Sequence, residues 1–140
     1  MPTNTDTDYL FVYGTLLTDS KHEMSQFLAS HAQLIGKGFF YGKLYIVTWF
    51  PGAVLSNSKN EKVHGMVFKV ESPETVFKVL DDYEGIGDYY KEPHLFKKAF
   101  TNVYLKNGTT IKASVYLYNL PTKGLKQIVF GDYLKYCADN

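Results

Sequence analysis

The amino-acid sequence predicts an α+β domain, and three observations support this prediction. Short runs of aromatic and β-branched residues recur along the chain, as is typical of β-strands. Two segments, near residues 20–31 and 72–85, instead carry apolar residues at helical spacing. Between residues 94 and 120, the pair Asn107-Gly108 separates two strand-like runs, which is a strong signal for a β-hairpin.

The strands are expected in order along the chain. Residues 9–13 (YLFVY) predict a buried strand that stops at Gly14. Residues 34–47 are aromatic and β-branched with interspersed glycines, a pattern that predicts a bent or bulged strand pair. The Pro-Gly pair in residues 49–53 (WFPGA) predicts a loop. Strands are then expected at about residues 53–56 and 63–70, on either side of the polar turn NSKN.

Each helix has a recognisable start. Asp19 or Ser20 is a candidate N-cap for the first helix, whose apolar positions are Met24, Phe27 and Leu28. The second helix is expected to begin with Ser72 as N-cap and Pro73 at its first position, and to end at Gly85.

The whole chain is expected to form one domain. Residues 1–7 are predicted to be a poorly ordered tail, and residues 8–140 a single folded unit without repeats or linkers. The hairpin strands are expected at residues 94–106 and 109–120. The closing stretch GLKQIVFGDYLKY is predicted to be irregular or a short helix packed on the sheet.

Composition excludes several classes of function. The chain has 140 residues, 45% hydrophobic and 16% aromatic, with a net charge of +1, so neither a basic surface for nucleic acid nor a membrane segment is expected. All fifteen basic residues are lysines. An anionic ligand would therefore be bound without the bidentate guanidinium of arginine. A single cysteine excludes an internal disulfide, and the polar, acidic N-terminus is unlike a signal peptide, so a cytoplasmic protein is expected.

The stretch LDDYEG, residues 80–85, holds three acids that are not equivalent. On a helical wheel with Val76 at zero, Glu84 falls at roughly 80°, inside the apolar arc of the second helix. Asp81, at roughly 140°, lies on the margin of the arc, and Asp82, at roughly 240°, points away from it. Partial burial, the helix C-terminus and two neighbouring acids are all expected to raise the pKa of Glu84, as proton transfer near neutral pH requires. The wheel alone also allows Glu84 to turn out to solvent beside Gly85.

A second group of residues follows the opening strand. The sequence YGTL, residues 13–16, places a turn directly after a buried strand, where backbone N–H groups can bind an anion. Read locally, Gly14-Thr15 can equally be a simple tight turn. The four histidines show no metal-ligand spacing, His31 is expected at the edge of the core, and Cys137 is expected to be inert.

Taken together, these motifs resemble the gamma-glutamylcyclotransferase-like family, and in particular its shorter gamma-glutamylamine cyclotransferase type. The resemblance rests on YGTL, GKLYIVTWFPGA, VHGMVFKV, LDDYEG, ASVYLY and GDYLKY, and it extends from residue 9 to about residue 136. It implies a small mixed, mostly antiparallel β-barrel with a few packed helices. It also implies a cofactor-independent enzyme, without a metal, that releases 5-oxoproline from a small gamma-glutamyl substrate.

The resemblance also implies roles for individual residues. Glu84 aligns with the family's acid/base glutamate. The residues implied in substrate binding are those of the turn and of the wall of the cavity: Tyr13, Gly14, Thr15, Leu16, Tyr45, Pro51, Gly52 and Tyr90.

The sequence departs from the family at one position, because family members often carry an arginine shortly after the tyrosine equivalent to Tyr90. Here Lys91 and Glu92 occupy that region. One alternative that therefore stays open is a barrel that binds a small metabolite without catalysis. An enzyme specific for glutathione is a further alternative, which the resemblance favours less because YGTL differs from the loop form of larger cyclotransferases.

Overall fold

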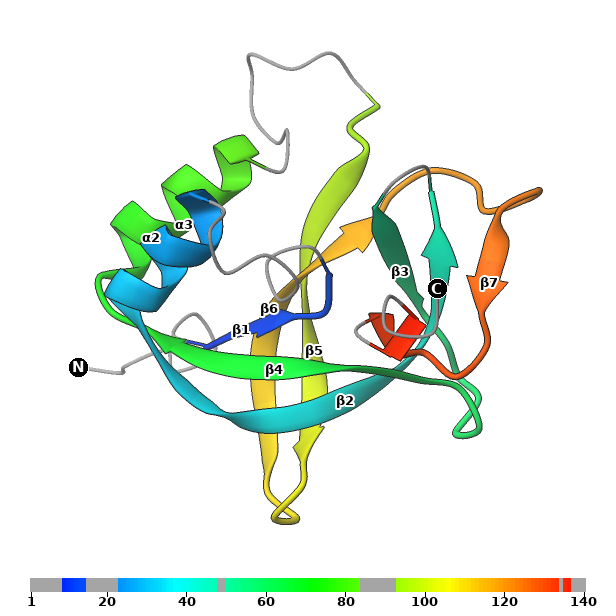
Figure 1. Cartoon of the computed structure of the whole chain (residues 1–140), viewed down its shortest axis with the longest axis horizontal. Coiled ribbons are helices and arrows are strands. Elements are labelled where there is room, and N and C mark those ends of the chain that lie inside the picture. The colour runs from blue at the N-terminus through cyan, green and yellow to red at the C-terminus, as the bar shows by residue number, and fades with distance from the viewer. Residues whose placement is uncertain (1–8, 15–22, 48–49, 84–92, 134, 137–140) are drawn as a thin grey trace.

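The computed structural model describes residues 9–14, 23–47, 50–83, 93–133 and 135–136. Five strands close into a mixed barrel in the order β2-β4-β1-β6-β5, and β5 pairs again with β2 (Figure 1). Among the described strands, only β1 and β6 run parallel to each other; the other pairs are antiparallel. The expected small, mostly antiparallel barrel is confirmed.

The barrel strands are β1 (Tyr9–Val12), β2 (Ala32–Ile46), β4 (Lys62–Val70), β5 (Phe96–Leu105) and β6 (Thr110–Tyr118). Two further strands, β3 (Pro51–Leu55) and β7 (Lys126–Ile128), pair with the second half of β2. The Asn107-Gly108 hairpin between β5 and β6 is confirmed, and Gly108 has a φ of +92°, a conformation that glycine adopts readily.

The prediction of a strand pair over residues 34–47 is wrong, because β2 is one continuous strand of 15 residues. Its bend is real: the register with β4 shifts between Leu34 and Gly36, which marks a bulge. The glycines serve close packing rather than a turn. A Cβ atom on Gly38 would lie 2.9 Å from the carbonyl oxygen of Tyr104 on the strand that closes the barrel.

Two further expectations need correction. The WFPGA segment is not a loop throughout, since Pro51 and Gly52 begin β3 opposite Ile46 and Tyr45. Proline is tolerated there because it is the first residue of the strand. The closing stretch is not only irregular or helical, because residues 126–128 form strand β7. Their partner is the distant strand β2, so no local pattern reveals the pairing.

Helices α2 (Glu23–His31) and α3 (Pro73–Tyr83) pack together on one side of the barrel (Figure 1). The carbonyl of Ser72 accepts the first helical hydrogen bonds of α3, from Thr75 and Val76, so the expected start is confirmed; the φ of Ser72 is +50°. Leu28 of α2 is buried, and His31 is half-buried, stacked on Phe27. The expected tail and N-caps at residues 19–20 lie outside the described residues.

Alternate residues of β1 serve two cores. Phe11 and Tyr13 point into the barrel, whereas Leu10 and Val12 pack against the helices. The helix side of this second core is formed by Leu28, Val76, Phe77 and Leu80. Because β1 is buried on both faces, its sequence is an unbroken apolar run, as predicted for a buried strand.

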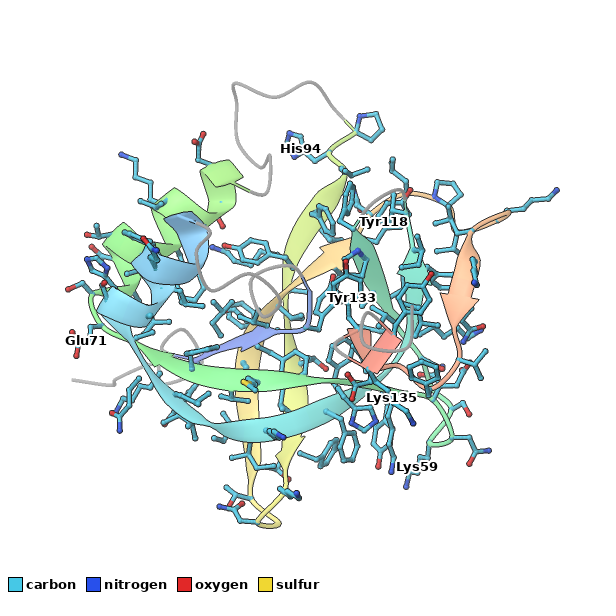
Figure 2. The ribbon with its side chains drawn as sticks, in the orientation of Figure 1. Lys59, Glu71, His94, Tyr118, Tyr133 and Lys135 are labelled. Carbon is cyan, nitrogen blue, oxygen red and sulfur yellow. The ribbon has the colours of Figure 1, made fainter. Side chains whose placement is uncertain are left out.

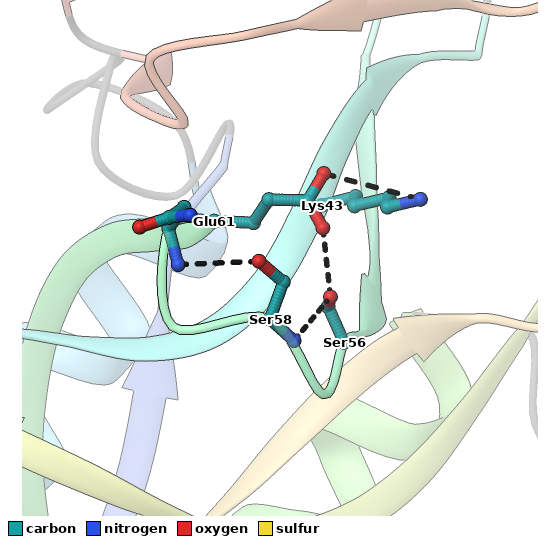
Figure 3. A network of polar contacts seen from close by, with 5 residues as sticks. Lys43, Ser56, Ser58 and Glu61 are labelled. Carbon is teal, nitrogen blue, oxygen red and sulfur yellow. Dashed lines mark hydrogen bonds and ion pairs between the residues drawn. The ribbon is translucent and has the colours of Figure 1, made fainter.

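A polar network holds the predicted NSKN turn between β3 and β4 (Figure 3). The hydroxyl of Ser56 donates a hydrogen bond of 2.8 Å to Glu61, and the backbone N–H of Ser58 donates one of 3.1 Å to Ser56. Lys43 of β2 lies 3.9 Å from Glu61. The turn is thus closed by its own side chains and tied to the neighbouring strand.

Candidate active site

The structure describes five of the nine residues that the sequence assigns to the site. Tyr13, Gly14, Tyr45, Pro51 and Gly52 are described, and they lie at the end of β1 and along the β2–β3 ladder. The other four lie outside the described residues: Thr15, Leu16, Glu84 and Tyr90.

Tyr13 fixes the end of β1 inside the barrel. Its side chain is 6% exposed, and its hydroxyl donates a hydrogen bond of 2.6 Å to the backbone carbonyl of Tyr116 on β6. The same hydroxyl accepts a hydrogen bond of 3.1 Å from the backbone N–H of Ala53 on β3. Tyr13 therefore contributes to the site by holding three strands together and fixing where the YGTL segment leaves the barrel.

The YG and PG segments lie against each other. A Cβ atom on Gly14 would be 3.0 Å from Cγ of Pro51, so the two segments are in close contact. A Cβ atom on Gly52 would be 2.9 Å from Cβ of Tyr118, which lies at the end of β6 (Figure 2). Gly14 and Pro51, 37 positions apart in the sequence, are thus brought to one place, and the glycines permit the close approach.

The remaining residues of the GxLY motif have structural roles. Leu44 is fully buried in the barrel core. Gly42 has no space for a side chain, because a Cβ atom there would collide with the carbonyl oxygen of Val54. Tyr45 is half-buried and pairs with Gly52 across the ladder, next to the YG–PG contact. Of this motif, Tyr45 is therefore the residue placed beside the candidate site.

The end of α3 is attached to the barrel by Asp81. Its Oδ1 atom accepts a hydrogen bond of 2.6 Å from the hydroxyl of Tyr116, and its Oδ2 atom lies 3.2 Å from Nζ of Lys98. The neighbouring Asp82 is exposed, as the wheel predicts. The position of Asp81 on the margin of the apolar arc was the one signal in the sequence for this contact; its partner on β6 could not be identified from the pattern.

Tyr116 thus joins two elements of the site. Its carbonyl holds Tyr13 at the end of β1, and its hydroxyl holds Asp81 in the last turn of α3. The chain leaves the first element toward Thr15 and Leu16, and leaves the second toward Glu84, three residues after Asp81. Sequence reasoning did not identify Tyr116 or Asp81 as residues that organise the site.

Within the described residues, no group of three or more His, Cys, Asp or Glu side chains could hold a metal ion. His31 accepts or donates a hydrogen bond of 2.9 Å through Nδ1 with the carbonyl of Phe27, a contact within its own helix. In the same part of the chain, no helix is long and apolar enough to cross a membrane.

Comparisons with known proteins identify the family and the fold. A family model described as "Gamma-glutamyl cyclotransferase, AIG2-like" matches residues 10–135. Among solved structures, an aig2-like protein (ggact) from Mus musculus superposes with a TM-score of 0.63 at 22% identity, covering 81% of this chain and 80% of that one. The solution structure of ytfP from Escherichia coli gives 0.61 at 27% identity, covering 92% and 98%.

YkqA from Bacillus subtilis gives a TM-score of 0.66 at 22% identity over 92% of this chain, but the chain spans only 40% of YkqA. No match was found among curated proteins. These likenesses show that the barrel fold is shared with proteins of both similar and greater length.

Proposed function

Because the chain belongs to the gamma-glutamyl cyclotransferase, AIG2-like family, we propose that it is a cyclotransferase that releases 5-oxoproline from a gamma-glutamyl amine or gamma-glutamyl amino acid. The observation that carries the proposal is the family match over residues 10–135, which includes every residue assigned to the site. The hydrogen bonds of Tyr116 to Tyr13 and to Asp81 support the proposal. They fix the end of β1, which precedes the rest of YGTL in the sequence, and the end of α3, which precedes Glu84.

In the proposed reaction, the alpha-amino nitrogen of the substrate attacks its own gamma-carbonyl carbon. A new C–N bond closes the five-membered ring, and the bond between the gamma-carbon and the leaving nitrogen breaks. The products are 5-oxoproline and a free amine, and no water is consumed. Because the attack is intramolecular, holding the substrate bent can lower the barrier by several kcal/mol, up to about 7–11 in the best-oriented cases.

Glu84 is proposed to move the proton. The alpha-amine of the substrate is an ammonium ion at neutral pH and cannot attack until it loses a proton. The carboxylate of Glu84 would take that proton and return it to the leaving nitrogen. Backbone N–H groups of the YGTL segment would stabilise the negative charge that develops on the carbonyl oxygen.

We propose that the enzyme is of the gamma-glutamylamine type, so that the leaving group is an amine. We also propose a cytoplasmic location. The chain has one cysteine and is compatible with a reducing compartment. Glutathione is the alternative substrate. The chain has Lys91 and Glu92 in the region where family members often carry an arginine, so the choice of leaving group is decided by assay.

The test is an assay of purified protein for 5-oxoproline. The panel contains gamma-glutamyl-epsilon-lysine, simple gamma-glutamyl amines, gamma-glutamyl amino acids and glutathione. Turnover of an amine or amino acid substrate is expected, and Glu84→Gln should lower kcat by about a hundredfold or more. Asp82→Asn is the matched control, because it removes a neighbouring acid that is exposed, and it should keep activity.

Two outcomes would contradict the proposal. Full activity of Glu84→Gln would remove Glu84 from the mechanism. Saturable binding of gamma-glutamyl compounds without any release of 5-oxoproline would instead support the non-catalytic binding barrel.

A further inference from the structure

A cavity lies away from most of the described residues of the candidate site. It has a volume of about 440 Å³ and opens on strands β2, β4 and β5 and on the C-terminal turn. Of the described candidate site residues, Tyr13 lines it, whereas Gly14, Tyr45, Pro51 and Gly52 do not. A volume in this range suits a small organic ligand.

Tyr13 belongs to the barrel core, whereas the aromatic side chains of β2, β4 and β5 that line this cavity come from the outer surface of the barrel. Phe40 of β2 and Val63 of β4 are fully buried and pair with each other in the core. Their chain neighbours Phe39 and His64, which also form a pair, must therefore point outward. Tyr104 of β5 pairs with Phe39 on the same outer surface.

These three side chains form one aromatic cluster, in which the His64 ring is tilted by 53° to the Phe39 ring. The rings of Phe39 and Tyr104 stack with centroids 5.5 Å apart at an angle of 29°, and the His64 ring lies 5.9 Å from Phe39. All three are half-buried, so ring surface remains accessible from the cavity. Burial lowers the pKa of His64 below 6.5, against the opposing effect of Asp132, so its imidazole is neutral at neutral pH. An aromatic cluster of this kind offers ring faces and edges against which a ligand ring can pack.

The rim of the cavity is positively charged. Lys37, Lys106 and Lys135 line it, with Asp132 as the one acid among its lining residues. All three lysines are exposed, and in the described part of the chain none of them forms an ion pair. Lys135 projects from the C-terminal turn that also carries the buried Tyr133 (Figure 2). The cavity therefore combines an aromatic cluster with a rim on which three lysines outnumber one acid, and this combination is complementary to an aromatic anion.

We propose that this cavity binds a small planar ring system bearing an anionic group, with the ring against Phe39, His64 and Tyr104 and the anion beside Lys37, Lys106 and Lys135. This chemistry can come from a 5′-mononucleotide, through its phosphate, or from an aromatic carboxylate. The cavity shares Tyr13 with the candidate site, but the proposal does not rest on the cyclotransferase reaction.

Calorimetry and amide NMR titration of the full chain test the proposal, with AMP and indole-3-acetate as probes. At least one probe is expected to bind saturably and to shift amide resonances at residues 37–39, 64–66 and 104–106. The tighter of the two identifies the source of the anion. If the nucleotide is the ligand, two controls should bind at least about tenfold more weakly than AMP. Adenosine lacks the anionic phosphate, and ribose 5-phosphate lacks the ring system.

Matched variants distinguish binding in this cavity from non-specific electrostatic attraction to surface lysines. Lys37→Gln combined with Lys106→Gln should weaken binding about tenfold. Lys97→Gln combined with Lys123→Gln removes the same charge from exposed positions outside the cavity and should leave affinity unchanged. Tyr104→Leu keeps an apolar side chain but removes the ring, and it should also weaken binding; circular dichroism checks its fold.

Three results would overturn the proposal. One is the absence of saturable binding of both probes at low millimolar concentration. Another is equal weakening by the two lysine pairs, which would indicate non-specific attraction. The third is competition between the bound probe and 5-oxoproline, which would place the probe in the cyclotransferase site instead.

Discussion

The carboxylate of Asp81 accepts a 2.6 Å hydrogen bond from the hydroxyl of Tyr116, and this contact joins the last turn of α3 to strand β6 across 35 positions of sequence. A double-mutant cycle of Asp81→Asn and Tyr116→Phe should give a coupling energy of about 1 kcal/mol in urea unfolding, because the acceptor is charged and partly shielded from water. In the matched cycle, Asp82→Asn with Tyr116→Phe, the coupling should be near zero. Equal coupling in both cycles would show that the contact has no specific role.

Tyr13→Phe should destabilise the protein by about 1–3 kcal/mol, since the carbonyl of Tyr116 and the N–H of Ala53 would both lose a buried hydrogen bond. Chemical denaturation measures the effect. Tyr9→Phe is the control, because the structure gives the Tyr9 hydroxyl no hydrogen bond among the described residues, and its effect should be within about 0.5 kcal/mol. A Tyr13→Phe variant as stable as the control would contradict the anchoring role.

Gly52→Ala should destabilise the protein by about 1–3 kcal/mol, because the new methyl group would lie 2.9 Å from Cβ of Tyr118 and from Cγ2 of Val47. At Gly36 the same substitution meets no atom within 4 Å and should be close to neutral. Thermal or urea unfolding of the two variants gives the comparison. Similar losses of stability in the two variants would mean that strand propensity, and not crowding beside the candidate site, explains why residue 52 is a glycine.

Acid should reduce stability through His64. Its pKa is lowered by burial, and Lys62 lowers it further, while Asp132 opposes the shift. Below pH 6.5 the unfolded chain therefore binds a proton that the folded protein resists. The stability of the wild type relative to His64→Gln should be constant above this pH, fall as the pH drops through it, and level off below the folded pKa. Urea unfolding between about pH 8 and pH 5 tests this, and a constant difference would exclude it.

The sequence predicts those elements whose signals are local. Strands β1 and β4, helix α3 and the Asn107-Gly108 hairpin were all identified from patterns within a few residues. What was missed depends on contacts between distant segments. Gly38 interrupts an apolar pattern and so suggested a break in β2, but its function is to let β5 approach and close the barrel. Strand β7 has three residues and no pattern of its own.

The candidate site divides in the same way. The family resemblance assigns Gly14 and Pro51 to substrate binding without relating them to each other, and the structure places these two residues in contact. Tyr116 is an ordinary strand tyrosine in the sequence. Its importance comes from its two hydrogen-bond partners, Tyr13 and Asp81, which are 103 and 35 positions away in the sequence. Separations of this size leave no trace in periodicity.

The placement of β1 between β4 and β6 has a consequence for how the protein is made. Strand β1 leaves the ribosome before its parallel partner β6, which, with Leu10 opposite Ser114, emerges more than a hundred residues later. Pairings between such distant segments slow folding. During most of translation, the edge of the apolar strand β1 that pairs with β6 therefore has no partner. An unpaired apolar edge of this kind exposes the nascent chain to aggregation.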